Sequence, residues 1–229
     1  MAEAVGAEVI VSAEEPDEVS NFQIFKFFIS MNKSTLIWIA VLAVVVLCGV
    51  WFAGRYNALV TEQENVEKAW GQVQTAYQAR AELVPQLVAT AKGLVQGEDK
   101  VLTDVMEARA KATAVTIDPT NLNESNFAQF QRAQNELTQA LSRLMAIRES
   151  YPDLKFNEQF GKLADQLEGI TNRVTIARRE FNECAQIYNT LVRKFPSNII
   201  ASMFGFEKRP YFEADEAAQQ APVVEFNFD

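Results

Sequence analysis

An uncharged run from Leu36 to Ala53 constrains the fold of this chain more than any other feature. With its flanks it provides about 20 apolar residues, and a helix of that length crosses a hydrocarbon layer of about 30 Å. Trp38 and Trp51 lie toward its two ends, where amphipathic rings favour the membrane interface. The sequence therefore predicts a transmembrane helix over residues 34–54.

Other uses of such a run fit this sequence less well. Secretory cleavage needs a small-x-small site, whereas bulky Trp51 and Phe52 precede Gly54. A lipoprotein is cut before its cysteine, at a junction that needs a small residue, but Leu47 precedes Cys48. A buried core helix seldom continues so far without a polar residue. The two flanks carry similar numbers of basic residues, so the positive-inside rule does not decide the orientation.

The two ends of the chain have the composition of segments without a core of their own. Residues 1–33 form an acidic leader that we expect to be mostly disordered. Its aromatic segment 22–29 is suited to a membrane surface or to an extension of the spanning helix. Met31 is an alternative translation start. Residues 214–229 are predicted to be a flexible acidic tail.

Charge and composition exclude several classes of function. The net charge is −9, whereas a protein whose main partner is nucleic acid needs a basic face. No histidine is present, which removes the usual general base and zinc ligand. Glu62, Glu64 and Glu67 lack the Glu-x-x-His pairs of carboxylate-bridged iron sites, which leaves an all-oxygen calcium or magnesium site as the metal alternative. We expect no enzyme activity, no metal and no cofactor, and interpret Cys48 and Cys184 as packing residues.

After Arg55, apolar residues recur at alternating spacings of three and four, as on one face of a helix. Pro85 is expected to bend or locally break the first of these patterns, and Pro196 to end the last. The sequence predicts an all-α fold in which the transmembrane helix continues into an antiparallel four-helix bundle, residues 55–196, with long first and last helices. An intermolecular coiled coil is the alternative. The four periodic segments cover residues 56–94, 101–115, 127–147 and 160–195.

Three asparagines that follow aromatic residues suggest a polar network inside the bundle. Asn182 and Asn189 are seven residues apart and share one face of the fourth helix. Asn57, at the start of the first helix, is expected to approach Asn189. With Arg178 and its candidate ion partner Glu64, these residues are predicted to fix helix register. A ligand-binding amide cluster is the functional alternative.

Residues 197–213 are aromatic, with two basic residues near their end. This composition is typical of an interfacial element beside a membrane. A lid that closes the open end of the bundle fits equally well. The predicted membrane-interface residues are Trp38, Trp51, Phe204, Phe206, Lys208 and Arg209.

Several blocks of sequence occur in a recognisable order. They include Arg-Tyr-Asn-x-Leu-Val at 55–60, Leu-Val-Pro-Gln-Leu-Val at 83–88, Ala-Arg-Arg-Glu-Phe-Asn at 177–182 and Phe-Pro-x-Asn at 195–198. In these blocks, residues 34–213 resemble the LemA family of bacterial membrane proteins. The resemblance implies a single-pass protein with a helical soluble domain and no established biochemical activity.

These observations lead to an expectation about function. We expect a scaffold or interaction protein of the bacterial cytoplasmic membrane, single-pass, whose helical bundle binds partners. The expected partners are the lipid bilayer and either further copies of the chain or other membrane proteins. A membrane-associated small-molecule sensor and a membrane-shaping factor are the alternatives.

Overall fold

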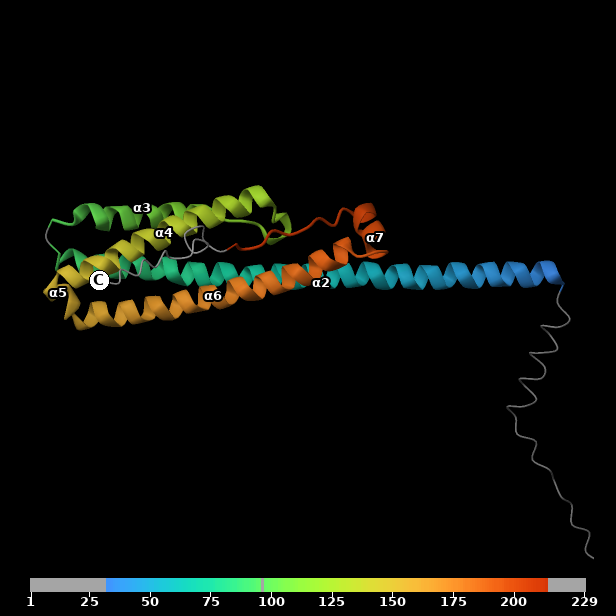
Figure 1. Ribbon diagram of the computed structural model, residues 1–229, viewed down its shortest axis with the longest axis horizontal. Coiled ribbons are helices and arrows are strands. Elements are labelled where there is room, and N and C mark those ends of the chain that lie inside the picture. Colours follow the sequence, from blue (N-terminus) through green and yellow to red (C-terminus); the bar gives the residue numbers. More distant parts are fainter. Residues whose placement is uncertain (1–31, 96, 214–229) are drawn as a thin grey trace, which may run out of the picture. The chain divides into compact units, whose positions relative to one another are not determined.

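A computed structural model describes residues 32–95 and 97–213, which contain six α-helices, one 3-10 helix and no strand (Figure 1). The all-helical prediction and the long apolar helix near the N-terminus are confirmed. The predicted leader (apart from its last two residues), its aromatic segment 22–29, the alternative start at Met31 and the tail 214–229 lie outside the described residues. The elements are α2 (Lys33–Lys92), α3 (Asp99–Ala114), η1 (Pro119–Asn121), α4 (Glu124–Ser150), α5 (Pro152–Lys155), α6 (Glu158–Arg193) and α7 (Ser197–Phe204).

The chain divides into two compact units, Met1–Gly54 and Arg55–Asp229. In the first unit, the helical residues have outward-facing apolar side chains, with Trp38 72% and Leu47 69% exposed. This part of α2 is the one described segment long and apolar enough to cross a membrane, and none of that window is buried. This window therefore contributes nothing to the buried core of the chain.

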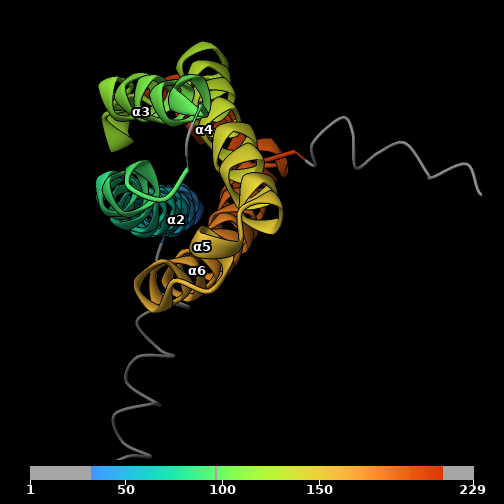
Figure 2. The same ribbon diagram turned by 90° about the vertical axis from the view of Figure 1, so that its left-hand side faces the viewer.

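The second unit has an aliphatic cluster at one end of its interior. Residues of α2, α3, α4, α5 and α6 meet there, and α3 and α4 lie side by side (Figure 2). Periodic apolar faces explain the packing, since each helix buries one stripe against the others. Fully buried members of the cluster are Val84, Leu87, Ala91, Val105, Leu137, Leu144, Leu154 and Phe160.

An aromatic cluster around Trp70 fills the other part of the interior. The Trp70 side chain is fully buried, and its ring centroid lies 5.1 to 6.2 Å from four phenylalanine rings. Its Nε1 donates to the carbonyl oxygen of Ile117 at 3.4 Å. Edge-to-face and offset ring contacts of this kind add to the stabilisation from buried area. The four rings belong to Phe127 and Phe130 of α4, Phe181 of α6, and Phe212.

The predicted local break at Pro85 is wrong, because α2 continues through this residue. A proline has no N–H to donate to the carbonyl four residues earlier, here that of Ala81. Arg109 of α3 supplies the missing donor, since its Nε donates to the Ala81 carbonyl oxygen at 2.8 Å. A side chain from a neighbouring helix thus satisfies the acceptor that the proline leaves unpaired.

Arg80 is a charged residue inside the second unit, with 4% of its surface exposed. Its guanidinium donates to Thr138 Oγ1 at 2.9 Å and to the Gln134 Oε1 atom at 2.7 Å. Burial lowers the pKa of the Arg80 guanidinium from its ordinary value. Among the described residues no carboxylate pairs with it, and its Nε is buried without a partner. Neutral acceptors of α4 therefore hold this charge against α2.

Candidate functional site: an extended segment on α6

The chain reverses direction after α7. Gly205, at the end of this helix, has φ 74°, in the left-handed region where glycine carries no steric cost. The Phe206 N–H donates to the carbonyl oxygen of Ala201 at 2.9 Å, which closes the end of α7. Residues 206–213 then run without helical structure and contact α6. We call residues 206–213 the C-terminal segment.

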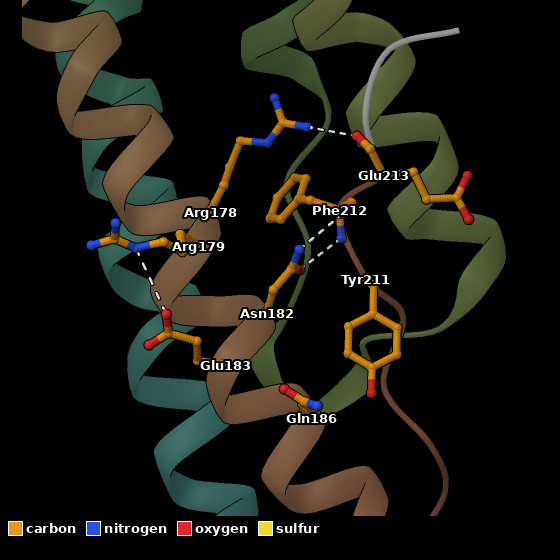
Figure 3. A pocket seen from close by; sticks show the side chains of 8 residues that line it. All are labelled: Arg178, Arg179, Asn182, Glu183, Gln186, Tyr211, Phe212 and Glu213. Atoms are coloured by element: carbon orange, nitrogen blue, oxygen red, sulfur yellow. Dashed lines mark hydrogen bonds and ion pairs between the residues drawn. The ribbon is translucent and has the colours of Figure 1, made fainter. Parts of the chain in front are cut away.

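Two asparagines of α6 bind the main chain of the C-terminal segment. Asn189 donates to the Arg209 carbonyl oxygen and accepts from the Arg209 N–H, both at 2.8 Å. Asn182 does the same with Phe212, at 2.9 and 2.8 Å, as the paired dashed lines in Figure 3 show. One carboxamide thereby satisfies both backbone groups of a residue that has no strand partner.

The side chains of Arg209 and Phe212 anchor the same segment. The Arg209 side chain is 9% exposed, and its Nη1 donates to the Leu122 carbonyl oxygen at 3.1 Å. Its Nη2 lies 3.8 Å from the Glu67 carboxylate of α2, which is itself 15% exposed. Phe212 inserts into the aromatic cluster around Trp70. The segment therefore joins α2, α6 and the loop before α4.

A groove of about 600 Å³ lies between α6 and the C-terminal segment (Figure 3). Arg178 donates to the Glu213 carbonyl oxygen at 3.0 Å, and its guanidinium lies 4.8 Å from the centre of the Phe212 ring. Arg179 forms an exposed ion pair with Glu183 at 3.7 Å. Both guanidinium groups thus contact groups of the chain itself. The groove is lined by Arg178, Arg179, Asn182, Glu183, Gln186, Tyr211, Phe212 and Glu213.

Comparison with known proteins identifies the family. The model of the LemA family matches residues 69–226, well over half of the chain. This chain belongs to the LemA family. The resemblance found in the sequence is thereby confirmed. The described residues of this LemA family member contain a helical unit and one candidate membrane span.

Individual relatives support the assignment. Protein LemA of Metamycoplasma hominis is 21% identical over 165 residues, which cover 72% of either chain. Magnetosome protein MamQ of Magnetospirillum gryphiswaldense is 33% identical over 85 residues, and MamQ 1 of Paramagnetospirillum magneticum is 31% identical over the same length. The matches to the two magnetosome proteins cover 37% of this chain but only 31% of theirs. The chain thus spans about a third of the length of these magnetosome relatives.

In this LemA family member, the structure brings together only part of the predicted polar network. Asn182, Asn189 and Arg178 all contact the C-terminal segment. Asn57 is exposed, and its carbonyl oxygen accepts a hydrogen bond from Thr61 Oγ1 at 2.9 Å. Glu64 is also exposed. The expected approach of Asn57 to Asn189 is not seen, because the Asn189 amide binds the main chain of Arg209.

The predicted membrane-interface residues have different surroundings. Trp38 and Trp51 are exposed in the first unit, and Lys208 is exposed in the second. Phe204 is exposed and Phe206 is half-buried. Arg209 is used otherwise, because its guanidinium lies in the interior of the second unit against Glu67 and two carbonyl oxygens.

Sequence reasoning did not find the anchoring role of Phe212 or the contacts of Tyr56. The Tyr56 ring lies 4.9 Å from that of Phe204 and 5.8 Å from that of Phe206. No periodicity marks Phe206 or Phe212, because the C-terminal segment is neither helix nor sheet strand. Its aromatic content was the available signal. Among the described residues, no group of three or more Asp, Glu or Cys side chains is placed to hold a metal ion.

Proposed function

We propose that this LemA family member is a single-pass protein of the bacterial cytoplasmic membrane, anchored by residues 34–54. One observation carries the anchoring: the window of α2 that is long enough to cross a membrane has no buried residue. An apolar surface of that extent is unstable in water and matches a hydrocarbon layer of about 30 Å. The Arg55–Asp229 unit is then presented at the membrane surface.

In this proposal the second unit is a structural scaffold that binds partner membrane proteins or further copies of the chain. Its helices α2, α3, α4 and α6 form an antiparallel four-helix bundle in which the first and last helices are long. The aliphatic and aromatic clusters support this arrangement, because between them they draw residues from all four helices. A densely packed interior gives a rigid surface, and a rigid surface loses little conformational entropy when a partner binds.

We propose binding rather than catalysis for this unit. The chain has no histidine, and the arginines that line the groove contact the chain's own carboxylate and carbonyl groups. The net charge of −9 favours protein and lipid partners over nucleic acid.

Reporter fusions at the two ends of the full chain test the anchoring. A single-pass anchor requires the N-terminal and C-terminal reporters to lie on opposite sides of the membrane. Recovery of both reporters on one side, or release of the protein by a carbonate wash, contradicts this part of the proposal.

Photo-crosslinking in living cells tests the scaffold role. A photoreactive residue replaces Ile187, which is 52% exposed on α6, and buried Leu137 serves as the matched control. The expected result is an adduct with a second copy or with a defined membrane protein, obtained from Ile187 and absent from Leu137. The proposal is contradicted if no exposed position gives an adduct and if the protein is also only monomeric in detergent-free lipid discs.

A further inference from the structure

Helix α7, together with Phe195 just before it, exposes large apolar side chains. The opposite face of the helix packs against the protein, where Ser197, Ile200 and Ala201 are buried. A short surface helix of a water-soluble unit normally presents polar residues outward. Here four large apolar side chains face outward beside exposed Asn198 and Ser202: Phe195 (75% exposed), Ile199 (52%), Met203 (67%) and Phe204 (52%). We call these four residues the α7 apolar face.

The α7 apolar face lies close in space to Tyr56, near the start of the second unit. The ring of Phe204 lies 4.9 Å from the ring of Tyr56 within the second unit. Tyr56 is the second residue after Gly54, which ends the first unit. Two residues of chain span at most about 7 Å. Covalent connection alone therefore keeps α7 near the point where the candidate membrane span ends.

Charge around the face matches an anionic lipid surface. Arg193 and Lys194 precede it, Lys208 follows it, and all three are exposed. Glu207 is the one acidic residue between positions 193 and 208, although the whole chain carries a net charge of −9. Aromatic and aliphatic side chains flanked by lysine and arginine are typical of helices that lie in the headgroup region. Basic residues at that depth attract anionic lipids.

We propose that the α7 apolar face lies in the headgroup region of the bilayer that holds the chain's own membrane span, against anionic lipids. This inference rests on the membrane anchoring proposed above and adds a second point of attachment. With two attachments the second unit has a fixed side toward the membrane and a fixed side toward its partners.

Depth measurements on the full chain, reconstituted in vesicles of phosphatidylethanolamine and phosphatidylglycerol, test the inference. Cys48 and Cys184 are first replaced by alanine. Single cysteines are then introduced as Met203→Cys, Phe156→Cys or Val44→Cys and labelled with an environment-sensitive fluorophore. Phe156 is the matched control, because it is a large apolar residue that is 81% exposed and directly follows the short helix α5. Val44 reports the anchoring itself.

The expected result is a shift to shorter wavelength and several-fold quenching by headgroup-spin-labelled lipid at position 203, with neither change at position 156. Quenching at position 44 by acyl-chain spin labels confirms anchoring in the same sample. Water-like emission at position 203 while position 44 is quenched overturns the inference and leaves the anchoring intact. Water-like emission at both positions overturns the anchoring as well.

A substitution and a dilution separate lipid from a protein partner. Ile199→Glu is expected to abolish the quenching at position 203, whereas Ile176→Glu, at an exposed site on α6, leaves it unchanged. Unchanged far-ultraviolet circular dichroism shows that both variants are folded. A label at position 203 that is shielded without lipid quenching, and that becomes exposed when protein is diluted with excess lipid, identifies a second copy as the occupant and overturns the inference.

Discussion

Asn182 and Asn189 lie seven residues apart on α6 and bind the main chain of Phe212 and Arg209, which are three residues apart. Seven helical residues rise about 10.5 Å, and three extended residues cover about 10 Å. The two spacings therefore match, so both carboxamides reach the segment without distorting it. Since the later asparagine binds the earlier residue, the segment runs antiparallel to α6.

Removal of one carboxamide is expected to destabilise the second unit. Asn189→Ala deletes two hydrogen bonds and leaves the N–H and carbonyl of Arg209 without their partners, which costs about 2 kcal/mol. Urea unfolding in detergent, followed by near-ultraviolet circular dichroism, measures the change in the free energy of unfolding. Asn172→Ala is the control, because Asn172 is exposed on the same helix, and its effect is expected to stay within about 0.5 kcal/mol. Equal effects of the two substitutions mean that the Asn189 carboxamide does not hold the C-terminal segment.

Neighbouring cations on the C-terminal segment are expected to behave differently. Arg209→Ala removes the ion pair with half-buried Glu67 and the bond to Leu122, so the segment opens more often. Lys208→Ala changes an exposed cation and leaves these contacts intact. The rate of chymotrypsin cleavage after Tyr211 is proportional to the fraction of molecules in which the segment is open. We expect this rate to be more than about tenfold higher in Arg209→Ala than in the native chain, and unchanged in Lys208→Ala. Similar cleavage rates in the two variants mean that Arg209 does not hold the segment.

The helices were predictable because their signal is local. The heptad pattern of the last long helix predicts α6, and Phe160 and Phe181 are both fully buried as the spacing requires. The partner of Asn182 was not predictable, because it lies 30 residues later on a segment with no periodicity. From the sequence alone, Arg209 and Lys208 are two adjacent basic residues, and nothing distinguishes their roles. Only the folded arrangement of Glu67 separates the paired cation from the exposed one.

The contact between Arg109 and the Ala81 carbonyl gives a test by double-mutant cycle. Pro85→Ala restores the N–H that pairs with Ala81 in a regular helix, so the Arg109 bond becomes less important. Arg109→Met is expected to cost about 1 kcal/mol more in the native chain than in the Pro85→Ala background. The free energies of unfolding of the four proteins measure this coupling.

Lys111→Met is the matched control for that cycle. Lys111 also lies on α3, and both side chains of its ion pair with Glu136 are exposed. Its substitution should have a small effect that does not depend on Pro85. Additive effects of Pro85→Ala and Arg109→Met show that the arginine does not compensate for the proline.

The thiol of Cys184 is expected to react slowly at neutral pH. Burial is the main cause that raises the pKa of the Cys184 thiol, and the carboxylates of Glu62, Glu183 and Glu180 raise it further. Because the thiolate is the nucleophile, a raised pKa moves the alkylation profile to higher pH. The unfolded chain loses this proton first as the pH rises, so the same shift lowers the stability of the folded state between the two pKa values.

Alkylation by iodoacetamide in a Cys48→Ala variant measures this directly. The rate against pH is compared for the folded protein and for the protein in urea, and the folded profile should lie at higher pH. Glu62→Gln removes one carboxylate and is expected to move the folded profile only part of the way back, since burial is the larger cause. Coincident folded and unfolded profiles contradict the raised pKa, and a complete return in Glu62→Gln assigns the shift to charge rather than to burial.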